Sequence, residues 1–472
     1  MTSAVPLVAG GILVVGFFAA CLRWERQGRS ELAVVTILAV LVADVVLYAE
    51  TSSASLVSVM QPRLGGQGLR LVQLAVLVAL AARFLVQGIP RRWVRSTPLW
   101  LGFFVWVAAS GVVGYLQGHT PPLILRQAMI IPMIGGGMLL IGGVQARQYV
   151  QSVALRRLFG GAAVAASLLL IVDTFGSTLT TNAIPGLPVQ SFGLYGADAG
   201  TVFAGLGMVG LAIGLYSPKG SRDRALWLVP GVVLMLSLFA TSQRAARLGL
   251  FVGCVILAVA ALTAVGRQRF LFNRRAFLLG ALGTLGVVLG IAFVAAAVNP
   301  WEHTENRTSA TPDFKNPFAA TSREGSILSR YHQWDVARDQ ILAAPFMGGG
   351  LGGTARHFEE GSKEVVESDI FHNIGLDLLS RLGLVGFLLA VGAVVALSLE
   401  TIDVWRRDQD NLVAALAIGG LATTGGILAK GMVESVFEKD RLAVLIGVGL
   451  GFMVSAVLTH HSTRQAALEN RG

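Results

Sequence analysis

The segment Gly383–Leu399, with the sequence GLVGFLLAVGAVVALSL, contains no charged side chain. A helix of about 20 predominantly apolar residues crosses the hydrocarbon core of a bilayer, and this segment reaches that length when it is extended back to residue 376. A strand of an outer-membrane barrel would instead alternate apolar and polar residues. The segment therefore predicts a membrane-spanning helix.

The composition of the whole chain supports the same class. Of its 472 residues, 54% are hydrophobic and only 14% are charged, whereas soluble domains carry about 25% charged residues. A soluble enzyme is therefore excluded. The two cysteines, Cys21 and Cys254, both lie in apolar runs and offer neither a disulfide framework nor a thiolate metal site.

The apolar runs predict an all-α polytopic membrane protein with about thirteen transmembrane helices. The expected spans are 4–22, 31–49, 69–89, 98–117, 123–144, 158–177, 200–216, 225–240, 248–265, 277–298, 376–399, 412–433 and 442–459. We divide the chain into a ten-helix transmembrane region (1–298), an extracytoplasmic loop (299–375) and a C-terminal part (376–472). The C-terminal part holds three transmembrane helices and a short cytoplasmic tail.

Basic residues follow every second span, and two more lie near the C-terminus. They are Arg23, Arg26, Arg29, Arg91, Arg92, Arg95, Arg147, Arg156, Arg157, Lys219, Arg222, Arg224, Arg267, Arg269, Arg274, Arg275, Arg406, Arg407, Arg464 and Arg471. The positive-inside rule places these connectors in the cytoplasm, so we expect an N-terminus outside and a C-terminus inside. The net charge of +10 then reflects membrane topology, and nucleic acid is not an expected partner.

Residues 299–375 form a long connector without a spanning segment, and the alternation places it outside the cytoplasm. The stretch 327–342 has near-helical apolar spacing and stops before Pro345. Long loops in compact proteins are usually functional or disordered. This composition favours a folded, helical loop, which is where we expect the chemistry of an enzyme. Its expected core is Tyr331, Trp334, Ile341 and Leu342.

Several polar residues lie at the expected outer boundary. Arg244 and Arg247 occupy a short outer connector where basic residues are disfavoured, and Arg126 lies near the outer end of the fifth span. These arginines either reach the phosphates of outer-leaflet lipids or hold an anionic group of a substrate. Arg330 is either solvated or functional, and the isolated His372 is either a hydrogen-bonded polar residue or a catalyst.

The loop also contains a glycine-rich run and two neighbouring acids. Residues 345–353, PFMGGGLGG, predict a tight turn that allows close backbone approach. A nucleotide cradle would need a strand before this run and a helix after it. Glu367 and Asp369 could bind a divalent cation, although two carboxylates alone are usually solvated loop residues.

Three motifs in the C-terminal half follow one another in a fixed order. His372-Asn373 is followed, after nine residues, by the Gly-x-x-Gly pair of Gly383 and Gly386. Upstream, one motif is Ser242-Gln-Arg244 after a span, and the other is Arg330-Tyr-His-Gln-Trp334 followed by Ala343-Ala-Pro345 and the glycine-rich run. Together these motifs resemble the bacterial O-antigen ligase and polymerase family. One departure is that the family's pattern has serine and arginine adjacent, whereas here Gln243 lies between Ser242 and Arg244. The N-terminal half is similar to the family only as generic spanning helices.

The resemblance implies a membrane glycosyltransferase that uses a glycan on a polyprenyl diphosphate carrier. It implies that the glycan passes, with inversion and without a metal or other cofactor, to an acceptor hydroxyl on the outer face of the cytoplasmic membrane. The expected partners are this undecaprenyl- or decaprenyl-linked donor, a glycan or glycolipid acceptor, and the lipid bilayer.

The resemblance also assigns roles to residues. His372 would be the general base, because imidazole has an ordinary pKa of about 6.5 that suits neutral pH. Arg244 and Arg330 would bind the diphosphate, because a guanidinium matches phosphate oxygens in a fork. Further diphosphate candidates are Arg247 and Arg126, and the expected supporting residues are Asn373, Tyr331, Trp334, Gly383 and Gly386.

Other functions remain open at this point. A polymerase of the same family would pass the glycan to another lipid-linked repeat, although the His-Asn motif favours a ligase. A transporter or flippase of lipid-linked sugars would use the same arginines to bind diphosphate but would not need His372 or the structured loop. Asp44, Asp173 and Lys430 would suit an ion pathway, but three scattered charges without a visible repeat make a poor transporter. A metal-dependent transferase would use Glu367 and Asp369, and a non-catalytic scaffold would not need His372.

Overall fold

The protein is described here from a computed structural model. The described residues are 4–47, 71–88, 93–179, 198–217, 222–238, 244–265, 321–359, 364–368, 371–408, 410–434, 436 and 440–470.

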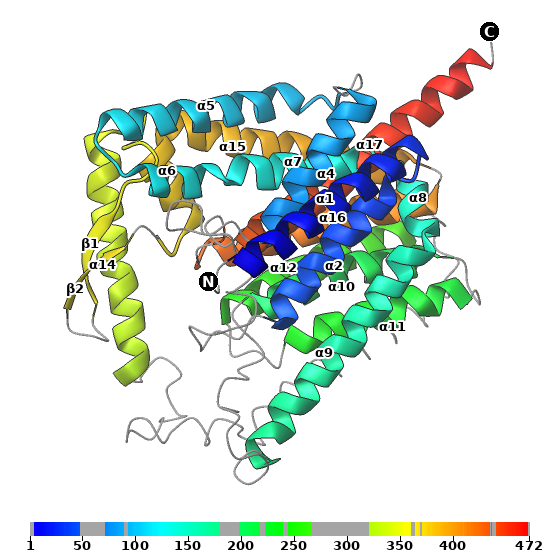
Figure 1. The fold of residues 1–472 in the computed structure, drawn as a ribbon, viewed down its shortest axis with the longest axis horizontal. Helices are drawn as coiled ribbons and strands as arrows, with labels where there is room; N and C mark the ends of the chain where they lie inside the picture. The colour runs from blue at the N-terminus through cyan, green and yellow to red at the C-terminus, as the bar shows by residue number, and fades with distance from the viewer. Residues whose placement is uncertain are drawn as a thin grey trace.

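Helices account for most of the described chain (Figure 1). The first part contains α1 (Ala4–Arg26), α2 (Glu31–Leu47), α4 (Leu71–Gln87), α5 (Thr97–Leu116), α6 (Pro121–Ala128), the π-helix η1 (Ile131–Gly135), α7 (Gly136–Gly142), α8 (Ala146–Gln151) and α9 (Val153–Leu179). The second part contains α10 (Ala199–Tyr216), α11 (Arg222–Ser237), α12 (Arg244–Val265), α14 (Thr321–Ala343), β1 (Ala355–Glu359), β2 (Glu364–Ser368), α15 (Ile374–Arg407), α16 (Asn411–Gly431) and α17 (Asp440–Glu469).

A helix lies over every expected span except 277–298, which falls outside the described residues. Within the described chain, seven helical stretches are long and apolar enough to cross a membrane by length and composition. They lie at Thr97–Leu116, Pro121–Gly142, Ala199–Tyr216, Ala245–Thr263, Ile374–Arg407, Asn411–Gly431 and Arg441–Glu469. The chain is therefore a helical, multi-pass membrane protein, while the number thirteen stays a prediction.

Helices α10, α16 and α17 form the centre of the bundle. In the apolar stretch of α17, 94% of the residues are buried. In that of α5 only 28% are buried, and many of its apolar side chains face outward. Small residues allow the central helices to approach closely. A Cβ atom at Gly137 of α7 would lie 2.9 Å from the backbone of Gly447 in α17.

The connectors gather at two opposite ends of the bundle (Figure 1). At the end that holds α8 and the C-terminus, Arg147 pairs with Asp410 and His460 with Asp408. At the other end, α14 and the β1–β2 hairpin lie across the ends of α5, α6 and α15. The structure thus separates α14 from basic connectors that the sequence predicts to be cytoplasmic.

The segment between α14 and α15 departs from the all-α expectation, because it contains a β-hairpin. Strands β1 and β2 pair antiparallel, with Ala355 opposite Ser368 and Glu359 opposite Glu364. The hairpin packs on α14 and covers one of its faces. Because a two-stranded hairpin is marginal alone, α14 supplies the surface on which it is stable.

The small core beneath the hairpin differs from the expected one. Its buried members are Ala337, Ala355 and Phe371, with Val336 and Leu376 packed against them. By contrast, the side chains of Tyr331 and Leu342 are 53% and 66% exposed. The assignment of these two to the core was wrong, because the buried face of α14 is lined by small and polar side chains.

Two charged residues singled out in the spans have partners inside the bundle. Asp44 of α2 pairs with Arg441 at the start of α17. Lys430, fully buried in α16, has its Nζ 2.9 Å from Thr201 Oγ1 and 3.5 Å from a Glu434 carboxylate oxygen. Such pairing lowers the cost of burying charge in a membrane protein. The side chain of Asp173 lies outside the described residues.

Candidate functional site

His372 lies between β2 and α15 and is half-buried. The preceding Phe371 is anchored in the small core, and the following Asn373 caps α15. Its Oδ1 accepts hydrogen bonds from the backbone N–H groups of Gly375 (2.9 Å) and Leu376 (3.1 Å). Such a cap satisfies amides that have no partner within the helix. The His372 backbone is thus fixed on both sides.

The His372 side chain is held by a glutamine of α14. Its Nδ1 lies 2.8 Å from Oε1 of Gln333, and Nε2 of the same amide lies 3.0 Å from Nε2 of His357 on β1. Gln333 and His357 are each only 5% exposed. The three side chains form a hydrogen-bonded row that joins α14, the hairpin and the start of α15.

Arg330 lies one turn before Gln333, so the two side chains are neighbours on the same face of α14. Its Nη1 donates to the carbonyl of Val433 at 3.0 Å. Asn373 Nδ2 donates to the adjacent carbonyl of Met432 at 2.9 Å. The turn after α16 therefore connects the helix that carries Arg330 to the cap beside His372.

The first turn of α12 lies near this same turn. Helix α12 packs on α16 in the opposite direction, and a Cβ atom at Gly249 would lie 2.5 Å from the Gly426 carbonyl oxygen and 3.3 Å from Lys430 Cβ. Arg244, the first residue of α12, and the half-buried Arg247 are thus placed at the C-terminal end of α16. The side chain of Arg244 lies outside the described side chains.

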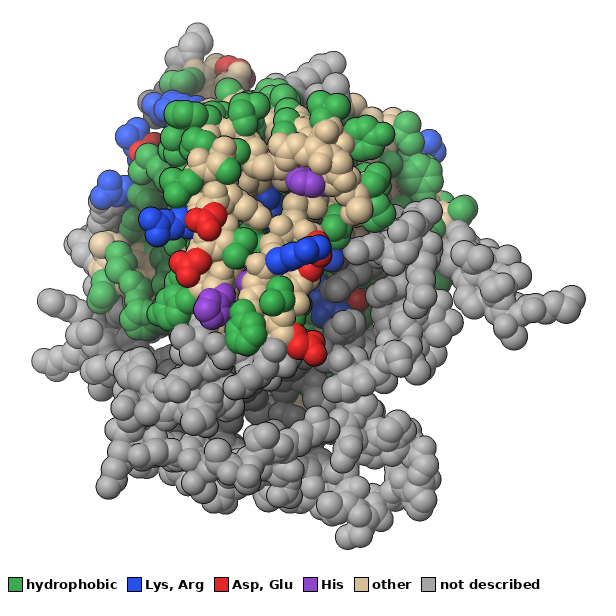
Figure 2. Space-filling view, turned by 90° about the vertical axis from the view of Figure 1, so that its left-hand side faces the viewer, with side chains coloured by type: hydrophobic (Ala, Val, Ile, Leu, Met, Phe, Trp, Pro, Cys, Tyr) green, Lys and Arg blue, Asp and Glu red, His purple; other side chains and the backbone are tan. Residues whose placement is uncertain are grey.

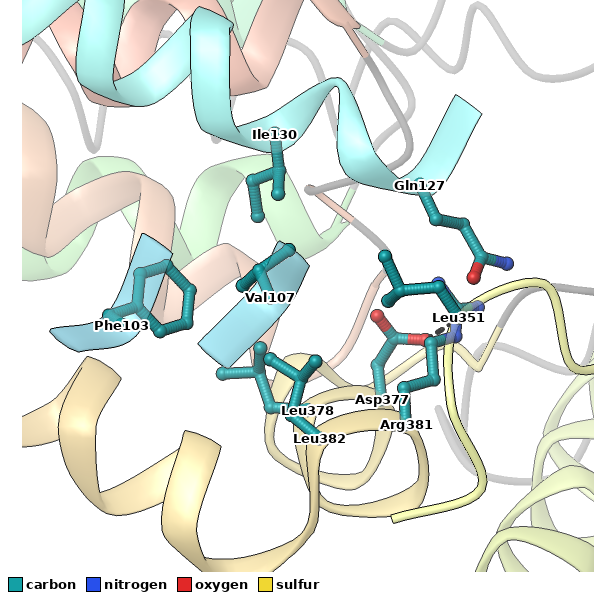
Figure 3. A pocket seen from close by; sticks show the side chains of 9 residues that line it. All are labelled: Phe103, Val107, Gln127, Ile130, Leu351, Asp377, Leu378, Arg381 and Leu382. Atoms are coloured by element: carbon teal, nitrogen blue, oxygen red, sulfur yellow. Dashed lines mark ion pairs between the residues drawn. The ribbon is translucent and has the colours of Figure 1, made fainter. Parts of the chain in front are cut away.

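Arg126 is half-buried on α6, beside the glycine-rich turn. Its neighbour Gln127 accepts a hydrogen bond from the backbone N–H of Gly352 at 2.6 Å. Figure 3 shows the small pocket at this place, in which Asp377 and Arg381 form a 2.8 Å ion pair. The pocket is lined by Phe103, Val107, Gln127, Ile130, Leu351, Asp377, Leu378, Arg381 and Leu382.

The glycine-rich turn packs into a kink of α15 at Gly383. The φ angle of Gly383 is +64°, in the left-handed region that residues with a side chain rarely adopt. A Cβ atom there would lie 2.3 Å from the carbonyl oxygen of Phe346. The expected close backbone approach is therefore confirmed.

The kink interrupts the helical hydrogen bonds, and the turn replaces them. The N–H of Leu384 donates to the Pro345 carbonyl at 2.8 Å, and the N–H of Gly349 donates to the Ser380 carbonyl at 2.7 Å. Because buried backbone groups need partners, the turn and the kinked helix form one structural unit.

Gly386, the second glycine of the pair, lies against α5. A Cβ atom there would lie 2.7 Å from the Trp106 ring, whose Nε1 donates to the Leu382 carbonyl at 2.8 Å. The two motif glycines thus have packing roles, because they allow the turn and α5 to contact α15 directly.

Tyr331 and Trp334 form an edge-to-face pair with ring centroids 5.5 Å apart. Tyr331 is largely exposed, so the pair lies at the surface of α14 next to Arg330. Figure 2 shows this end of the molecule, where histidine and charged side chains lie among apolar ones. Trp334 is half-buried, so Tyr331 is the exposed ring of the pair.

Glu367, one of the two candidate cation ligands, has protein partners on the hairpin. Its carboxylate accepts a 2.6 Å hydrogen bond from Thr354 Oγ1 and lies 3.4 Å from Arg356 Nε. These two partners hold the pKa of Glu367 below its ordinary value of 4.5. In the part of the chain that the structure describes, no three His, Cys, Asp or Glu side chains cluster as metal ligands. Asp369 lies outside that part.

Gln333 and His357 were not predicted from the sequence. Both lie on faces that pack inward, and only the fold brings them to His372 from 39 and 15 positions away in the chain. One signal was present in the sequence. Gln333 falls between Arg330 and Ala337 at helical spacing, which puts an uncharged polar side chain on the inward face of α14.

The fold and the site define a multi-pass helical membrane protein with a histidine and arginines at one end of its bundle. Residues 229–391 match the family described as O-antigen ligase. This stretch contains α12, α14, His372 and both motif glycines. The match confirms, over these residues, the resemblance of the motifs to the O-antigen ligase and polymerase family. No curated protein matches the chain.

Proposed function

We propose that the protein is a glycosyltransferase that passes a glycan from a polyprenyl diphosphate to an acceptor hydroxyl. The observation that carries this proposal is the arrangement on α14. One helix presents Arg330 and, one turn later, Gln333, which holds His372 at 2.8 Å. A base and a phosphate-binding cation are the two groups that such a transfer requires.

Diphosphate binding would rest on the arginines around the end of α16. A guanidinium has five N–H donors, and Arg330 uses one of them on Val433. Other donors of this group can bind phosphate oxygens in a fork. Arg244 and Arg247 would contribute from α12, and Arg126 from α6. Their positive charge would stabilise the diphosphate as it leaves, which is usually a large contribution to such catalysis.

His372 would remove the proton from the acceptor hydroxyl. As the oxygen forms its bond to the anomeric carbon, the bond from that carbon to the diphosphate oxygen breaks. The bonding electrons leave with the polyprenyl diphosphate, and the proton remains on the imidazole. A single displacement of this kind inverts the anomeric centre. The arginines supply the positive charge, so no metal is required.

The site would face away from the cytoplasm. Among the connectors that the structure describes, those rich in arginine lie at the end of the bundle opposite α14 (Figure 1), and the positive-inside rule assigns such connectors to the cytoplasm. The donor would therefore be lipid-linked, because soluble activated sugar nucleotides are confined to the other side.

The experiment that tests this function is transfer by purified protein, given a lipid-linked oligosaccharide and a series of envelope glycans and glycolipids. A ligase, which we favour, gives a product one glycan larger than the acceptor. A polymerase gives a ladder of longer lipid-linked chains. Movement of the lipid across vesicle membranes without any transfer would contradict both and indicate a flippase.

A further inference from the structure

We propose that Gln333 is a positioning residue that fixes which ring nitrogen of His372 carries the proton. The catalytic role of Gln333 rests on the proposed function, whereas the tautomer of His372 can be measured separately. It starts from the amide of Gln333, which contacts His372 Nδ1 at 2.8 Å and His357 Nε2 at 3.0 Å.

A side-chain amide has one accepting and one donating end. Its oxygen faces His372, so Nδ1 of His372 carries the hydrogen and Nε2 carries the lone pair. Its nitrogen faces His357, so Nε2 of His357 accepts. Nε2 of His372 is therefore the basic atom that would take the acceptor proton.

The surroundings of Gln333 keep this arrangement in place. The amide is buried beside the apolar cluster of Ala337, Ala355 and Phe371, which keeps water from competing for its bonds. The His357 ring, itself buried, has its Nε2 on the Gln333 amide, so the amide lies between two histidine rings. A histidine base oriented by a second side chain is a recurring arrangement in catalysis.

Charged and titratable neighbours must be considered in any test that changes pH. Such groups on the elements packed around His372 include Arg330, His332 and Asp335 of α14, Arg356 and His357 of β1, Glu364 and Glu367 of β2, Asp377 and Arg381 of α15, and Glu434 after α16. A single substitution at Gln333 keeps all of these residues, although it removes the hydrogen bond to His357.

The first test reads the tautomer directly. Full-length protein with ¹⁵N-labelled histidine is reconstituted in lipid bilayers and studied by solid-state NMR, with the His372 signals assigned from their loss in His372→Ala. We expect the Nδ1–H form in the wild type and a shift toward the Nε2–H form in Gln333→Leu. His460, which pairs with Asp408 at the opposite end, is the internal control. An Nε2–H wild type, or a tautomer unchanged by Gln333→Leu, would overturn the inference.

The second test is kinetic and uses lipid-linked glycan extracted from the source organism. Gln333→Leu should lower kcat about ten- to a hundredfold with little change in KM, the range found when the hydrogen-bond partner that orients a metal-binding histidine is removed. Gln333→Glu should recover part of kcat. It should also move the acidic limb of the pH–rate profile to higher pH, because a carboxylate beside an imidazole favours the protonated ring.

The matched control is Gln340→Leu on the same helix, whose amide donates to the Thr354 carbonyl at 3.1 Å. Equal losses in the two leucine variants, or a wild-type kcat in Gln333→Leu, would contradict a positioning role. Normal transfer by His372→Ala would instead overturn the proposed function, and the NMR result would still decide the tautomer.

Discussion

Arg330 and Asn373 donate hydrogen bonds to two consecutive backbone carbonyls, those of Val433 and Met432. The turn after α16 thereby fixes α14 relative to the N-terminus of α15. One of these elements carries the proposed phosphate-binding arginine and the other begins beside the proposed base. The distance between the two functional groups is thus set by a turn that neither motif contains.

Replacing Arg330 should weaken both donor binding and transfer. We expect Arg330→Ala to lower kcat/KM by about 10²–10³, the range found when one group that stabilises developing negative charge is removed. Arg330→Lys should recover only part of this loss, because an ammonium cannot form the fork. The measurements are transfer kinetics and binding of polyprenyl diphosphate to the purified protein.

The control for this series is Arg338→Ala, which removes an exposed arginine two turns further along α14. It should retain wild-type kinetics. If Arg330→Ala binds the lipid and transfers glycan as well as Arg338→Ala does, Arg330 does not bind the diphosphate.

Replacing Gly383 should destabilise the fold. Alanine at a φ of +64° is strained, and its Cβ would meet the Phe346 carbonyl, so we expect a cost of about 2 kcal/mol or more. Thermal unfolding in detergent measures it. Gly392→Ala on the same helix is the control, because the nearest atom to its Cβ is Leu99 Cδ1 at 3.8 Å. Equal melting temperatures for the two variants would show that the kink does not need a glycine.

Replacing Asn373 separates its two hydrogen-bonding roles. Asn373→Ala loses the cap and the bond to Met432, and should cost about 0.5–2 kcal/mol. Asn373→Asp keeps an acceptor for the helix amides but loses the donor to Met432. Both melting temperature and transfer are measured. We expect Asn373→Asp to be the more stable variant. Because both variants lose the bond to Met432, the reverse order would mean that the cap does not stabilise the fold.

Replacing Glu367 tests the metal-dependent alternative. Because the carboxylate is already bound by Thr354 and Arg356, Glu367→Gln should transfer glycan at the wild-type rate. Its lowered pKa means that the carboxylate stabilises the fold above the ordinary pKa of 4.5 and ceases to do so as the pH falls through the folded-state value. The small difference in melting temperature from the wild type should therefore be present at pH 7 and vanish in acid. Loss of transfer that added divalent cation restores would favour the metal-dependent reading.

The class of fold could be predicted from the sequence because apolar length is a local property. Segments such as Gly383–Leu399 need only be long and uncharged to be identified as helices. The hairpin was missed because Val365 and Val366 form too short a run to indicate a strand without α14 beneath it. Tyr331 and Leu342 were placed in the core because aromatic and aliphatic residues are normally buried, whereas α14 buries small and polar ones.

The site was predictable only in part, for a similar reason. His372, Arg330 and the two glycines stand out because their spacing is fixed along the chain. The contact of Gln333 with His372, by contrast, depends on how α14 packs against the start of α15. The role of Gly383 illustrates the difference. Its place in a motif was visible in the sequence, but the carbonyl of Phe346 that requires it was not.

The most direct test of the central claim is transfer by purified protein in the presence of EDTA, comparing the wild type with His372→Ala. A general base contributes typically about 10²–10⁴-fold to the rate. We expect that the wild type remains active in EDTA and that His372→Ala loses activity by that factor while folding normally. Equal transfer by the two proteins would contradict the assignment of His372, and loss of wild-type activity in EDTA would contradict the metal-independent mechanism.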